Sequence, residues 1–114
     1  MEQLPTTVVE FPAFTAAAEN VWTAEEKEAF IDYISRHPLA GAVVQGTGGV
    51  RKVRWLRTGM GKSGGVRVIY FHHSARLPLF LLTVYAKNVQ ADLGADQKRA
   101  MKRLVEAIVT GYGK

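Results

Sequence analysis

Six basic side chains and no acidic one lie between positions 48 and 70, a composition typical of a site for a polyanion. An arginine guanidinium binds phosphate through two parallel hydrogen bonds, and a lysine ammonium supplies a compact positive charge. Phosphate-rich RNA is therefore the ligand that we expect for this stretch. The six basic residues are Arg51, Lys52, Arg54, Arg57, Lys62 and Arg67.

Two β-strands joined by a glycine-rich turn would position these cations. Residues 50–56 and 65–72 are rich in valine, isoleucine and aromatic side chains, which favour strands. Alternate residues of a strand share one face of the sheet. We therefore expect Lys52, Arg54 and Arg67 to converge on one face of a hairpin.

A third strand is predicted at residues 79–86, the most apolar stretch of the chain. Tyr85 would share a face with Lys87 at the end of this strand, so that both could join the cationic face. The three consecutive strands would form an antiparallel meander.

Two helices and a short strand are expected before the cationic stretch. Residues 7–11 favour a strand, and the apolar spacing of residues 14–21 favours a helix. Thr23 and Glu26 have the spacing of a capping box, which would start a second helix that ends near residue 36.

The rest of the pattern predicts an α+β domain that spans residues 1–114. Residues 39–49 are expected to form a loop, and the last helix would begin with Asp96 as its N-cap and end at Gly111. The sheet would be small and antiparallel, a three-strand meander plus the N-terminal strand. Helices would pack on one face and leave the other face free for binding.

The distribution of charge along the chain supports a polyanion as ligand. From position 33 to position 91 the chain has nine lysines and arginines and no aspartate or glutamate, although the net charge of the whole chain is only +5. Such a field attracts phosphate-rich partners. It also removes the carboxylates that usually act as general bases.

Composition restricts the other classes of function. The chain has no cysteine, so neither disulfides nor thiolate chemistry are expected, and a reducing cytoplasm suits it. No apolar run approaches the ~20 residues that span a bilayer, and the N-terminus lacks the pattern of a signal peptide. We therefore expect a cytoplasmic protein that does not bind a membrane.

Three motifs, in order, resemble the HigB branch of the RelE/ParE toxin superfamily. They are QGTGGVRKVR at 45–54, GKSGGVRVIY at 61–70 and LTVYAKN at 82–88. The resemblance implies a RelE-like microbial RNase fold and the toxin of a type II toxin–antitoxin system, a ribosome-dependent mRNA endonuclease that needs no metal or other cofactor. It also implies three partners, which are mRNA, the ribosome and a HigA-like antitoxin with a helix-turn-helix.

The resemblance also assigns catalytic residues. The basic pair of the family in the first hairpin strand is matched by Lys52 and Arg54, the arginine of the second strand by Arg67, and the late basic position by Lys87. The family's tyrosine near the C-terminus has no clear match, because Tyr112 lies at the end of the last expected helix.

The chemistry that these residues would perform is attack of the RNA 2′-hydroxyl on the adjacent phosphate. Neighbouring cations disfavour the charged form of a lysine, so Lys52 is the candidate general base. Arg54 and Arg67 would clamp the phosphate through planar donors. The residues expected to bind the RNA itself are Arg51, Arg57, Lys62 and Tyr85.

A binding-only module of the same fold stays open as an alternative. It would be a ParE-like inhibitor of DNA gyrase or a plain RNA-binding protein. Nucleotide binding is not expected, because Gly61, Lys62 and Ser63 lack the upstream glycine that a phosphate-binding P-loop requires.

Overall fold

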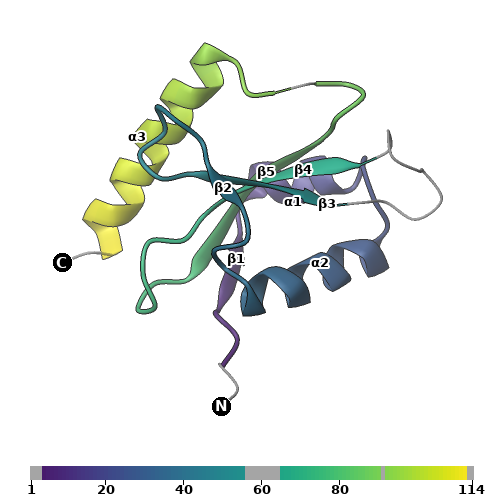
Figure 1. Cartoon of the computed structure of the whole chain (residues 1–114), viewed down its shortest axis with the longest axis horizontal. Coiled ribbons are helices and arrows are strands. Elements are labelled where there is room, and N and C mark those ends of the chain that lie inside the picture. The colour runs from purple at the N-terminus through teal and green to yellow at the C-terminus, as the bar shows by residue number, and fades with distance from the viewer. Residues whose placement is uncertain (1–3, 56–64, 91, 113–114) are drawn as a thin grey trace.

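The computed structural model describes residues 4–55, 65–90 and 92–112, which form a five-stranded mixed sheet and three helices (Figure 1). The strand order is β1-β5-β4-β3-β2. The α+β class is confirmed. In chain order the elements are β1 (Val8–Glu10), α1 (Pro12–Ala18), α2 (Ala24–Arg36), β2 (Ala42–Val43), β3 (Arg51–Trp55), β4 (Val66–Phe71), β5 (Leu79–Ala86) and α3 (Ala95–Tyr112).

The sheet differs from the expected one at both edges. β1 pairs with β5 in parallel, so the sheet is mixed rather than antiparallel throughout. β2 lies within the expected loop and pairs with β3. The turn between β2 and β3 is closed by the buried Thr47 hydroxyl, which donates to the Val44 carbonyl and accepts from the Val50 N–H. This side-chain bridge explains why a glycine-rich stretch still forms an edge strand.

α1 and α2 both begin at residues that favour the N-terminus of a helix. α1 begins at Pro12, two residues before the expected start, because proline tolerates the first helical position. At α2 the Thr23 hydroxyl accepts from the Glu26 N–H, and the Glu26 carboxylate accepts from the Thr23 N–H. The predicted capping box is therefore confirmed.

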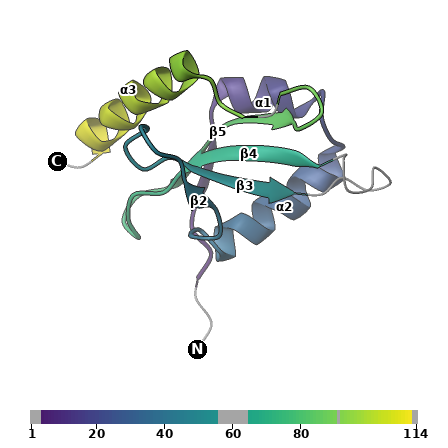
Figure 2. The ribbon, with the colours of Figure 1, turned by 45° about the horizontal axis from the view of Figure 1, so that its top comes forward.

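One face of the sheet packs against α1 and α2. Alternate residues of β4, together with residues of β5, meet aromatic residues of the two helices in one buried cluster. Figure 2 shows both helices behind the strands. The large members of this cluster include Phe14, Trp22, Phe30, Ile34, Val66, Val68, Tyr70, Leu79 and Leu81.

The third helix does not join the other two, which corrects the expectation that all helices cover one face. Val105 and Ile108 of α3 pack in a second buried cluster with Ile69, Phe71 and Phe80 from the opposite face of the sheet. α3 lies at one end of the sheet, apart from α1 and α2 (Figure 2). Val105 and Ile108 lie near the end of β4 and the start of β5, and the cluster continues to Tyr85 and Leu93 in the other half of this face, which has no helix of its own in the described part of the chain. Among the described residues, no helix is long and apolar enough to cross a membrane.

A β-bulge in β5 determines which side chains of this strand project to the face that α3 partly covers. Leu82 is an extra residue, because neighbouring residues of β4 pair with Leu81 and Thr83. A bulge interrupts the alternation of side chains along a strand. Leu81 therefore faces α1 and α2, whereas Tyr85 faces the opposite side and lies across from Arg67.

We predict that Tyr70→Phe lowers the free energy of unfolding by about 1–3 kcal/mol. The buried Tyr70 hydroxyl accepts from the Gly41 N–H at 2.8 Å and donates to the Pro38 carbonyl at 2.9 Å, so the variant leaves buried backbone groups unpaired. Urea unfolding measures the loss. Tyr112→Phe is the matched control, because Tyr112 is exposed, and equal effects of the two substitutions would refute the prediction.

Candidate functional site

Three polar side chains form one row across the middle of the sheet. Arg54 of β3 lies directly opposite Arg67 of β4, and Arg67 lies directly opposite Tyr85 of β5. Residues that lie opposite each other on antiparallel strands project to the same face. Lys52 lies two residues before Arg54 in β3 and shares this face. The register thus brings three of the predicted catalytic residues together with Tyr85.

Two members of the row hold buried polar atoms that have no hydrogen-bond partner among the described residues. They are Nη1 of Arg67 and the hydroxyl oxygen of Tyr85. Tyr85 is 8% exposed, so bulk water reaches its side chain poorly. Leaving such groups unpaired costs free energy, and native proteins rarely do so without a functional reason. Both groups are hydrogen-bond donors, and they belong to residues that lie opposite each other on adjacent strands.

The environment of Tyr85 keeps its phenol protonated. Burial raises the pKa of Tyr85, the negative charge of Asp92 raises it further, and the positive charge of Arg67 opposes the shift. A phenol is protonated at neutral pH even at its ordinary pKa of 10.0, so the Tyr85 hydroxyl is available as a hydrogen-bond donor. A phosphate oxygen is an acceptor that suits both this phenol and the arginine beside it.

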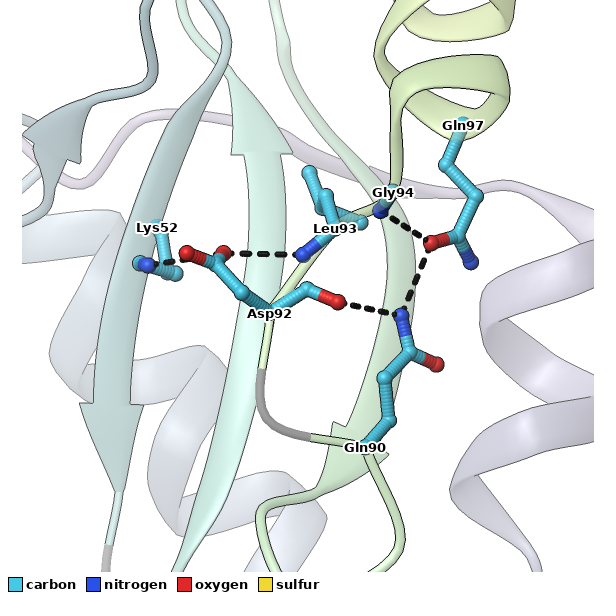
Figure 3. A network of polar contacts seen from close by, with 6 residues as sticks. All are labelled: Lys52, Gln90, Asp92, Leu93, Gly94 and Gln97. Atoms are coloured by element: carbon cyan, nitrogen blue, oxygen red, sulfur yellow. Dashed lines mark hydrogen bonds and ion pairs between the residues drawn. The ribbon is translucent and has the colours of Figure 1, made fainter.

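A carboxylate lies against Lys52, which corrects the expectation of a face without acidic groups. Lys52 Nζ is 3.0 Å from Oδ1 of Asp92, and the same oxygen accepts from the Leu93 N–H at 2.8 Å (Figure 3). The bond from Lys52, followed by that from Leu93, lowers the pKa of Asp92. Forty residues separate this pair in the sequence, so the charge pattern along the chain did not reveal it.

The segment that brings Asp92 to the sheet is held by two glutamines (Figure 3). Gln90 Nε2 donates to the Asp92 carbonyl and to Gln97 Oε1, and Gln97 Oε1 also accepts from the Gly94 N–H. α3 consequently begins at Ala95. Asp96 lies in the first turn of the helix and is not the N-cap that we expected.

The structure places the other predicted residues differently. Arg51 points away from the row, because its guanidinium donates to the Gly41 carbonyl at 2.6 Å and holds the loop before β2. Lys87 lies beyond the end of β5 and is exposed, although its N–H donates to the Gly65 carbonyl next to β4. Arg57 and Lys62 lie outside the described residues.

Tyr85, not Tyr112, supplies a hydroxyl at this site. The Tyr112 ring packs on Phe80, with 5.4 Å between ring centroids, in the part of the sheet that α3 covers. From the sequence we expected Tyr85 to bind RNA, and we did not assign it a role as proton donor. The sequence pattern gave no sign of the bulge at Leu82 or of the burial of the Tyr85 hydroxyl.

We predict that Tyr85→Phe leaves the free energy of unfolding unchanged within about 0.5 kcal/mol, or raises it. The variant keeps the buried ring and removes a hydroxyl that makes no hydrogen bond within the described protein. Urea unfolding beside Tyr70→Phe makes the comparison direct, since both substitutions delete one buried hydroxyl. A loss above about 1 kcal/mol would mean that the Tyr85 hydroxyl has a partner in the protein.

A family model described as the RelE toxin of the RelE/RelB toxin–antitoxin system matches residues 38–111. The match covers more than half of the 114 residues and includes the row from Arg54 to Tyr85 and the Lys52–Asp92 pair. An antitoxin is the partner that this family implies. The chain therefore belongs to the RelE family of toxins from toxin–antitoxin systems.

Proposed function

We propose that this toxin is a ribosome-dependent mRNA endonuclease that stops translation in the bacterial cytoplasm. One observation supports this function above all others. Two buried donors that have no partner among the described residues, Arg67 Nη1 and the Tyr85 hydroxyl, lie in one row with Arg54 and beside Lys52. A phosphate of single-stranded RNA has the charge and the acceptor oxygens to fill this position.

The proposed reaction cleaves RNA by internal attack. The 2′-oxygen forms a bond to phosphorus while the bond from phosphorus to the next 5′-oxygen breaks, which gives a 2′,3′-cyclic phosphate and a free 5′-hydroxyl. The 2′-hydroxyl loses its proton to water, and the departing 5′-oxygen must gain one. Between these events the phosphoryl oxygens gather negative charge, so fixed positive groups accelerate the step.

Arg67 and Arg54 would supply most of this stabilisation. Arg67 is half-buried, and a guanidinium in a partly dehydrated position interacts more strongly with phosphate than one in water. Lys52 Nζ lies 3.0 Å from Oδ1 of Asp92 and would add its positive charge to theirs. In this proposal Lys52 stabilises charge, and its role as general base stays a prediction from the sequence.

Tyr85 would donate the proton that the departing 5′-oxygen requires. The phenol is protonated at neutral pH, and its position opposite Arg67 would put the hydroxyl beside the bound phosphate. The positive charge of Arg67 would stabilise the phenolate until solvent returns the proton. This assignment fills the role of general acid, for which the family resemblance offered no residue.

We predict that Arg67→Ala lowers mRNA cleavage by at least about 10²-fold, the usual loss when one charge-stabilising donor is removed. Primer extension on transcripts from translating ribosomes measures the rate, and circular dichroism verifies the fold. Arg36→Ala is the matched control, because it removes an exposed arginine of α2 that pairs with Asp32. Cleavage at the wild-type rate by Arg67→Ala would refute the assignment.

The same assay separates the nuclease from the gyrase inhibitor. Induction of a nuclease leaves cut transcripts and intact DNA, whereas a gyrase inhibitor leaves intact transcripts and triggers DNA damage. Intact transcripts after induction of the wild-type protein would overturn the proposed function itself.

We further predict that Tyr85→Phe cleaves at least about 10²-fold more slowly than the wild type, because the variant loses its proton donor. Single-turnover cleavage on ribosomes tests this prediction under conditions where binding is saturated. Because we predict that this substitution does not destabilise the protein, a slower rate would not be due to unfolding. Cleavage at the wild-type rate would exclude Tyr85 as the general acid.

A further inference from the structure

The carboxylate of Asp92 occupies a position that suits an external anion. Its Oδ1 accepts from the ammonium of Lys52 and from the backbone N–H of Leu93, at 3.0 and 2.8 Å (Figure 3). An ammonium and a backbone N–H are the donors that proteins use to hold phosphate oxygens. We propose that Lys52 Nζ and the Leu93 N–H form a second phosphate subsite, which Asp92 fills in the free protein and which RNA takes over by displacing that carboxylate.

The position of this subsite suits the phosphate next to the one that is cleaved. Lys52 and Arg54 are two residues apart on β3, which separates their backbones by about 7 Å along the strand. This distance is comparable to the separation of neighbouring phosphates in an extended RNA strand. The inference rests on the proposed function, because it takes the row from Arg54 to Tyr85 as the first phosphate site.

Charge gives a reason for the carboxylate to leave when RNA binds. The negative charge of Asp92 already acts on the Tyr85 hydroxyl, and a phosphate bound there would be repelled in the same way. The ion pair is open to solvent, since the side chains of Lys52 and Asp92 are 30% and 57% exposed. Exposed ion pairs contribute little to stability, so RNA can displace this one at low cost.

The segment around Asp92 can keep its place after the carboxylate has moved. Gln90 binds the main-chain carbonyl of Asp92 rather than its side chain, and Gln97 binds the N–H of Gly94. Neither bond uses the carboxylate. The Leu93 N–H would therefore stay at the sheet as a donor for phosphate.

The experiment measures the affinity of a short 2′-O-methyl oligoribonucleotide, which cannot be cleaved, for the wild type and for Asp92→Asn. The variant should bind more tightly, by about two- to five-fold, because RNA no longer has to break the ion pair. Its plot of log K against log salt should be steeper by about 0.7, since one more phosphate is neutralised without a competing carboxylate. Fluorescence anisotropy over a range of salt concentrations gives both quantities.

Two further variants test whether the effect belongs to this position. Asp96→Asn makes the same change of net charge at an exposed site on α3, where the aspartate pairs with Arg99, and should leave the affinity and the slope near wild type. In the Lys52→Gln background, Asp92→Asn should have no effect, because the cation of the subsite is gone. Thermal unfolding verifies that every variant is folded.

Three results would overturn the subsite. They are an unchanged or weaker affinity for Asp92→Asn, an equal gain for Asp96→Asn, and a gain that persists without Lys52. Ribosomal cleavage by the wild type tests the proposed function separately. Tighter RNA binding by Asp92→Asn, without any mRNA cleavage by the wild type, would support the subsite and refute the nuclease. Cleavage by the wild type, with no change of affinity in Asp92→Asn, would support the nuclease and refute the subsite.

Discussion

Burial of polar groups without partners costs free energy, and the described part of this protein bears that cost at Arg67 and Tyr85. The described residues hold four buried side-chain nitrogen or oxygen atoms without a partner. Two of the four, on Arg67 and Tyr85, lie opposite each other on neighbouring strands. Adjacent donors of this kind suit one shared acceptor, and the cations beside them favour an anion. The sheet and the helices packed on it hold these two residues opposite each other.

The helices cover the two faces of the sheet unequally. α1 and α2 cover one face, and α3 covers the other face only where β4 ends and β5 begins. The row from Arg54 to Tyr85 lies at the opposite ends of these strands. The bulge at Leu82 lets β5 contribute to both faces, because it directs Leu81 to the cluster of α1 and α2 and directs the buried Tyr85 to the opposite face.

Much of this arrangement follows from the sequence, since the strands, the capping box of α2 and the shared face of Lys52, Arg54 and Arg67 are set by local patterns. The parts that sequence reasoning missed depend on contacts between distant residues. A bulge is a property of strand pairing, so the composition of β5 gives no sign of Leu82. The pairing of Asp92 with Lys52 crosses forty positions and depends on the path of the chain into α3.

The contact with Asp92 changes how the cationic face is understood. A cluster of basic groups alone would hold any polyanion, and its own repulsion would destabilise the folded state. The internal carboxylate of Asp92 pairs with one of these groups, and we propose that RNA replaces it. The sequence predicts an attraction for RNA, and the structure adds a carboxylate in contact with Lys52.

The measurement that tests the central claim most directly is a crystal structure of the toxin bound to a 2′-O-methyl oligoribonucleotide. We expect a phosphate within hydrogen-bonding distance of both Arg67 Nη1 and the Tyr85 hydroxyl. RNA bound elsewhere on the protein, with these two groups still lacking a partner, would contradict the claim that they form the phosphate site.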